Sequence, residues 1–91
     1  MATAISLVHH RVNDHAAWRA VYDEVEPLRQ QYGCFGAEVF VDPADKEDVY
    51  VIHRFPSVEQ AEGFCGSDEL KAAMQRAGVA GAPRIEIAVE A

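Results

Sequence analysis

Hydrophobic and polar residues alternate along several short stretches of this chain, which is the period expected of β-strands with one buried face. These stretches cover residues 5–12, 35–41, 49–55 and 84–90. Two other segments, residues 15–32 and 58–77, carry apolar residues at the three- and four-residue spacing of amphipathic helices. The pattern therefore predicts the order strand, helix, strand, strand, helix pair, strand.

Polar and cyclic residues mark where the predicted helices begin and end. Asn13-Asp14 offers a cap for the first helix, which should end at Gly33 and kink or break near Val25 because of Pro27. Ser57 and Ser67 can cap the two later helical segments. The first helix should bury one set of side chains and expose another. The buried set is Trp18, Val21, Tyr22, Val25, Leu28 and Tyr32, and the exposed set is Arg19, Asp23, Glu24, Glu26 and Arg29.

This element order predicts an α+β fold of the ferredoxin-like class, a single domain over residues 1–91. Residues 42–48 are rich in turn formers and should connect the second and third strands as a hairpin. Helices would cover one face of an antiparallel sheet, with the first and third strands at its centre. The other face would expose apolar side chains, a pattern typical of a homodimer that packs sheet against sheet.

The alternation of side chains along a strand also places neighbouring histidines on different faces of the sheet. His9 and His10 are adjacent on the first strand, so their side chains point to opposite faces of the sheet, and only one of them can share a face with His53 on the third strand. The sequence leaves open which one it is, because strand register is not fixed by the pattern. Neutral histidine is a common proton acceptor, so each of these residues is a candidate catalytic group.

The composition argues against some classes of binding partner. The chain has a net charge of −7, with 15 acidic against 8 basic residues, which argues against nucleic acid or an anionic membrane surface. No apolar run approaches the length of a membrane helix, and we expect a cytoplasmic protein. Cys34 and Cys65 lack the spacing of a redox or zinc motif and are expected to be reduced thiols.

Several segments resemble the antibiotic biosynthesis monooxygenase-like proteins of the dimeric α+β barrel group. They are Val8-His9-His10-Arg11-Val12 leading into Ala17-Trp18-Arg19, then Glu26-Pro27-Leu28-Arg29, and Ser67-Asp68-Glu69-Leu70-Lys71-Ala72-Ala73-Met74 before Ala77-Gly78-Val79. The resemblance implies a homodimer with a small apolar cavity in each subunit between sheet and helices. Members of the group include cofactor-independent monooxygenases acting on polyketide-derived aromatics, haem-degrading enzymes and aromatic polyketide cyclases, and the fold alone does not choose among these activities.

These observations give a specific hypothesis for the site. His53, with whichever of His9 and His10 shares its face, would take a proton from a phenol or enol. Trp18 and Tyr22 would position the ring. Arg54 would either stabilise an oxyanion or pair with an acidic neighbour. We assign the remaining large apolar side chains to the core, namely Phe40, Phe55, Phe64 and Met74.

Other functions stay open at this point. The same fold could serve as a non-catalytic homodimer that binds a small ligand, or could bind haem. No metal site is predicted, because Asp14 and Glu38, the carboxylates nearest in pattern to the histidines, show no recognisable ligand spacing. No tightly held cofactor is predicted either.

Overall fold

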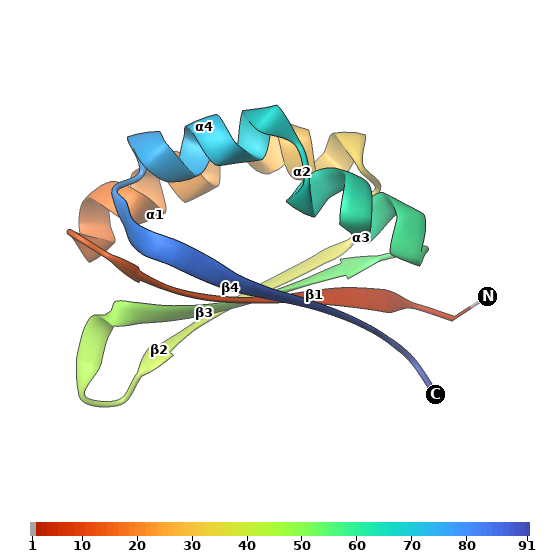
Figure 1. The fold of residues 1–91 in the computed structure, drawn as a ribbon, viewed down its shortest axis with the longest axis horizontal. Coiled ribbons are helices and arrows are strands. Elements are labelled where there is room, and N and C mark those ends of the chain that lie inside the picture. The colour runs from red at the N-terminus through yellow and green to blue at the C-terminus, as the bar shows by residue number, and fades with distance from the viewer. Residues whose placement is uncertain (1) are drawn as a thin grey trace.

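A four-stranded sheet and four helices form two layers in the computed structural model, which describes residues 2–91 (Figure 1). The elements are β1 (Ala4–Val12), α1 (His15–Glu24), α2 (Glu26–Gln31), β2 (Gly36–Asp42), β3 (Asp45–Phe55), α3 (Val58–Cys65), α4 (Asp68–Arg76) and β4 (Val79–Val89).

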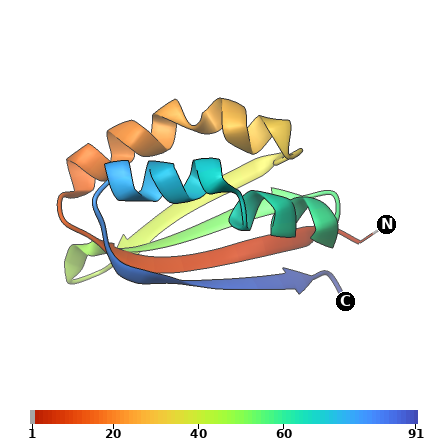
Figure 2. The same cartoon turned by 45° about the horizontal axis from the view of Figure 1, so that its top comes forward.

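The strands lie in the order β2-β3-β1-β4, and each neighbouring pair is antiparallel. All of the helices cover one face of the sheet and leave the other face open (Figures 1 and 2). The predicted α+β ferredoxin-like architecture is confirmed, including the central position of the first and third strands.

The predicted helix boundaries are also observed, and each has a local cause. The Asp14 side chain accepts hydrogen bonds from the backbone N–H groups of Ala16 and Ala17 at 2.9 and 3.2 Å, which caps α1. The helix ends at Glu24 with Val25 as its C-cap, and Pro27 lies in the first turn of α2, where its missing N–H costs no helical hydrogen bond. Ser57 and Ser67 cap α3 and α4 through their hydroxyl oxygens.

Two strands are longer than the sequence pattern predicts. β3 begins at Asp45, because the Asp42 carboxylate accepts a hydrogen bond from Ala44 N at 2.9 Å and closes a tight turn. β4 begins at Val79, where Val79 and Ala80 pair with Val12 and Arg11 ahead of a register shift between His9 and Arg11. The shift interrupts the alternation that would have revealed this part of the strand.

The buried side chains form two clusters between sheet and helices. One contains Val8, Val12, Trp18, Val49, Val51 and Ala77, and the other contains Ala4, Phe55, Ala61, Phe64 and Leu70. The core assignment of Phe40 is wrong: its side chain is 51% exposed, because it pairs with Tyr50 on the open face of the sheet. Both cysteines are free, and no helix within residues 2–91 is long and apolar enough to cross a membrane.

Phe55 offers a test of this core. We expect Phe55→Ala to lower the free energy of unfolding by about 3–5 kcal/mol, because the fully buried ring leaves a cavity between β3 and α3. Phe35→Ala removes a ring that is 60% exposed and should change the free energy by less than about 0.5 kcal/mol. Urea denaturation followed by circular dichroism measures both, and equal losses would contradict the core described above.

Candidate functional site

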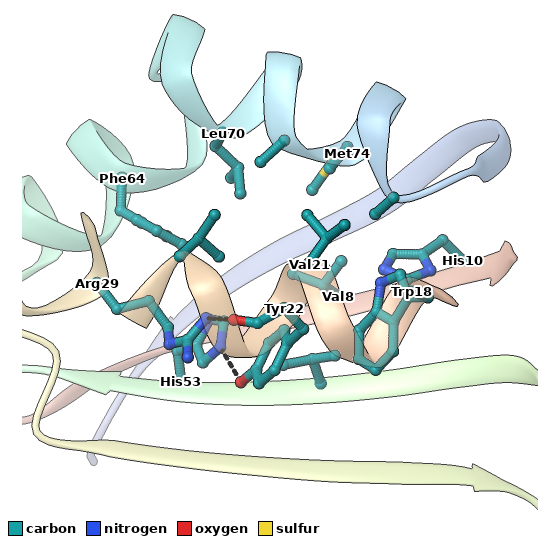
Figure 3. A pocket seen from close by; sticks show the side chains of 14 residues that line it. Val8, His10, Trp18, Val21, Tyr22, Arg29, His53, Phe64, Leu70 and Met74 are labelled. Carbon is teal, nitrogen blue, oxygen red and sulfur yellow. Dashed lines mark hydrogen bonds between the residues drawn. The ribbon is translucent and has the colours of Figure 1, made fainter. Parts of the chain in front are cut away.

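A cavity of about 50 Å³ lies between the sheet and the helices (Figure 3). Side chains of β1, β3 and all four helices surround it, and most of them are apolar. The lining residues are Val8, His10, Trp18, Val21, Tyr22, Val25, Arg29, Val51, His53, Phe64, Leu70, Ala73, Met74 and Ala77.

The pairing of β1 with β3 decides which histidines reach this cavity. Ser6 pairs with His53 and His10 pairs with Val49, so His10 and His53 point to the helix-covered face. Both are buried, with exposed fractions of 6% and 4%. His9 points to the open face, where its Nε2 lies 2.7 Å from a carboxylate oxygen of Asp48 and its ring stacks on Tyr50.

The central polar contact of the cavity joins α1 to β3. The Tyr22 hydroxyl and His53 Nε2 are 2.8 Å apart and share a hydrogen bond, drawn as a dashed line in Figure 3. The two rings are nearly parallel, and the Trp18 ring stacks on the far side of Tyr22 with its centre 4.9 Å away. Among residues 2–91, His53 Nδ1 has no hydrogen-bond partner.

Burial keeps the imidazole and phenol groups of the cavity uncharged at neutral pH. Loss of hydration, reinforced by the positive charge of Arg29, lowers the pKa of His53 to about 4. Burial also lowers the pKa of His10 and raises that of Tyr22. The site therefore presents neutral imidazoles and a neutral phenol.

Arg29 is a cavity residue that the sequence analysis placed on the exposed side of the helix, and that placement is wrong. The residue is only 6% exposed. Its Nη1 donates a hydrogen bond to the Tyr22 carbonyl oxygen at 2.8 Å, and its guanidinium carbon lies 4.0 Å from the centre of the Tyr22 ring. The sequence contained a signal of this burial. Arg29 follows Tyr22 by seven residues and Val25 by four, which is the spacing of residues on one helix face.

Arg54, the other arginine considered for the site, lies elsewhere. It is on the open face of the sheet, where its Nη2 donates to a Glu38 carboxylate oxygen at 2.9 Å. The structure thus gathers His53, His10, Trp18 and Tyr22 around one cavity and leaves His9 and Arg54 on the opposite face. Arg29 occupies the position by the cavity that Arg54 does not reach.

The arrangement combines a neutral proton acceptor, a phenol and a permanent cation on the walls of a largely apolar cavity. Such a set can hold a flat organic molecule, accept a proton from it and stabilise negative charge. Within residues 2–91, no three His, Cys, Asp or Glu side chains come together in a way that could hold a metal ion.

Solved structures of other proteins share this fold. A proposed antibiotic biosynthesis monooxygenase from Bordetella bronchiseptica superimposes with a TM-score of 0.83 at 13% identity, covering 100% of this chain and 99% of that one. A second one, from Caulobacter crescentus, has a TM-score of 0.74 at 19% identity and covers 96% and 88% of the two chains. A protein of unknown function from Nitrosomonas europaea has a TM-score of 0.76 at 16% identity, with 99% and 90% covered.

At these identities the solved structures bear on the fold alone, and no curated protein matches the sequence. The family comparison is more informative. The model of the family described as antibiotic biosynthesis monooxygenase matches residues 1–76, which include β1, β3 and every helix that lines the cavity. The chain therefore belongs to the antibiotic biosynthesis monooxygenase family.

Proposed function

We propose that the protein is a cofactor-independent monooxygenase that oxidises a small aromatic substrate carrying an ionisable hydroxyl group. Family membership supports the reaction class. The observation that carries the proposal is the Tyr22–His53 hydrogen bond on the wall of an apolar cavity, where His53 is neutral and able to accept a proton.

The proton path follows from that hydrogen bond. His53 Nε2 is already bonded to the Tyr22 hydroxyl, so a proton from the substrate reaches it through this hydroxyl. Tyr22 takes the substrate proton while it gives its own proton to His53. The high pKa of Tyr22 prevents it from keeping a negative charge, so the charge stays on the substrate.

The oxidation needs only dioxygen as co-reactant. The deprotonated ring donates an electron pair to O2 and forms a carbon–oxygen bond, giving a peroxide anion. This anion takes back the proton held by His53 through Tyr22 and becomes a hydroperoxide. Loss of water from the hydroperoxide leaves one oxygen atom on the ring as a carbonyl. A phenol and O2 then give a quinone and water, so atoms and electrons balance.

The size of the cavity bears on the substrate. Its volume of about 50 Å³ is smaller than the roughly 150 Å³ that admits benzene. A single ring enters only when lining side chains move, and Met74, which is unbranched and only partly buried, is the most adaptable of them. We therefore favour a one-ring substrate over a multi-ring polyketide.

We further propose that the protein is a homodimer formed through the open face of the sheet. That face carries the apolar side chains Ile5, Leu7, Phe40, Tyr50 and Ile52, and several of them are well exposed. Packing two such faces together would bury a patch of a kind that monomers seldom expose.

Oxygen uptake tests the assignment of the proton acceptor. With a small hydroquinone or phenol as substrate, His53→Gln should lower kcat/KM by about 10²–10⁴-fold, because the proton acceptor is lost. Tyr22→Phe should cause a loss of similar size, because it interrupts the path to Nε2.

His9→Gln is the matched control, since it makes the same change at the other face of the sheet. It should keep the wild-type rate when both variants are compared in the same oligomeric state. Binding without any oxygen uptake in the wild-type protein would favour a non-catalytic ligand-binding homodimer instead.

The pH profile gives a second test. His53 must be neutral to accept a proton, and its pKa lies at about 4, so protonation should not reduce kcat/KM until the pH falls below about 5. An unperturbed histidine would halve kcat/KM near pH 6.5. Oxygen uptake between pH 4 and 8 measures this, with circular dichroism to verify folding, and a midpoint near 6.5 would argue against His53.

Light scattering after size-exclusion chromatography tests the dimer. Leu7→Glu should convert dimer to monomer, because it places a charge on the open face. Val58→Glu is the control: Val58 has the same exposed fraction, 37%, but lies on α3, and the variant should stay dimeric. A monomeric wild-type protein, or two dimeric variants, would contradict the proposed interface.

A further inference from the structure

Arg29 is a buried cation whose charge is not balanced by an ion pair. The side chain is nine-tenths buried, and none of the ion pairs formed within residues 2–91 involves it. Burying a charge without a counter-charge is strongly unfavourable, so such a group normally has an anionic partner. The partner is absent from the described part of the chain.

Most hydrogen-bonding capacity of this guanidinium is unused. A guanidinium has five N–H donors, and within residues 2–91 this one makes a single hydrogen bond, from Nη1 to the Tyr22 carbonyl oxygen. One flat face rests on the Tyr22 ring at 4.0 Å. The group therefore has donors left for a second acceptor.

Neighbouring acidic residues do not neutralise it. Arg29 also borders a polar surface groove that contains Asp23 and Glu26. Asp23 is engaged by Arg19, whose Nε donates to it at 3.1 Å, and Glu26 forms no ion pair with Arg29. On its other side Arg29 borders the apolar cavity, whose lining includes the stacked rings of Trp18 and Tyr22.

We infer that the cavity binds an aromatic carboxylate, with Arg29 holding the carboxylate group. A carboxylate is charged at neutral pH whether or not a proton has been transferred, and it matches the fork of a guanidinium in a two-bond contact. A phenol is neutral until the Tyr22–His53 pair takes its proton, so it does not balance Arg29 in the resting complex.

The inference deepens the proposed function and rests on it only for the hydroxyl end of the ligand. Together they describe a hydroxyaryl carboxylate, with its carboxylate on Arg29 and its hydroxyl on Tyr22. Figure 3 shows the side chains of Arg29 and Tyr22 side by side on one wall of the cavity.

Isothermal titration calorimetry of benzoate and benzamide tests the carboxylate contact without turnover. The two probes have the same shape and differ in charge. Wild-type protein should bind benzoate at least about tenfold more tightly than benzamide, the effect of a charge-assisted hydrogen bond in a buried site. Equal affinities, or no binding of benzoate, would overturn the inference without any variant.

Variants locate the effect. Arg29→Gln should abolish the preference for benzoate, and Arg29→Lys should keep part of it, since the charge remains while the two-bond contact is lost. Arg76→Gln makes the same change at an exposed arginine of α4 and should keep the full preference. A preference for benzoate that survives Arg29→Gln would overturn the assignment to Arg29. If Arg29→Gln does not fold, an undiminished preference in Arg29→Lys would overturn it.

These experiments distinguish failure of the oxygenase proposal from failure of the carboxylate inference. His53→Gln should keep the benzoate preference while losing oxygen uptake. A benzoate preference that depends on Arg29, in a protein that consumes no oxygen with any hydroxybenzoate, would leave the anion site standing and refute the oxygenase. Oxygen uptake with neutral phenols, without any preference for benzoate, would refute the anion site and leave the oxygenase standing.

Discussion

The antiparallel pairing of β1 with β3 is the constraint on which the site depends. Each residue of a strand faces the opposite side from its neighbours, so the pairing of Ser6 with His53 fixes the surroundings of every side chain along both strands. A shift of one residue would send His10 to the open face and bring His9 under the helices. Because the helices cover one face only, that shift would also exchange the core with the exposed patch.

Burial then gives the cavity groups their chemistry. Loss of hydration beneath the helices, reinforced by the charge of Arg29, keeps the His53 imidazole neutral. The same loss of hydration holds Tyr22 in its protonated form. His9 lies one residue from His10 but partners an aspartate on the open face. Adjacent residues of the same type thus differ in environment because the backbone alternates.

Much of the fold could be predicted from the sequence, because strand and helix periods and their caps are local signals. The break at Val25 followed from Pro27, and the helix starts followed from Asp14, Ser57 and Ser67. The early part of β4 was missed because a register shift interrupts its alternation. Phe40 was misplaced because hydrophobic character alone does not tell a core side chain from one on an uncovered sheet face.

The site was only partly predictable, for a related reason. His53, Trp18 and Tyr22 were singled out as aromatic or titratable residues on apolar faces, whereas Arg29 was treated as a surface residue because arginine is seldom fully buried. Its helical spacing matched the buried stripe, but the break at Pro27 made the phase of α2 uncertain. The choice between His9 and His10 required the register, which arises from pairing between distant segments.

The break between α1 and α2 has a thermodynamic consequence for Arg29. In an uninterrupted helix the Tyr22 carbonyl would accept the N–H of residue 26, but here the Arg29 side chain donates to it. A long side chain carries about 2 kcal/mol of rotamer entropy when free. That entropy is lost when the chain folds, so a ligand meeting this guanidinium finds it already ordered.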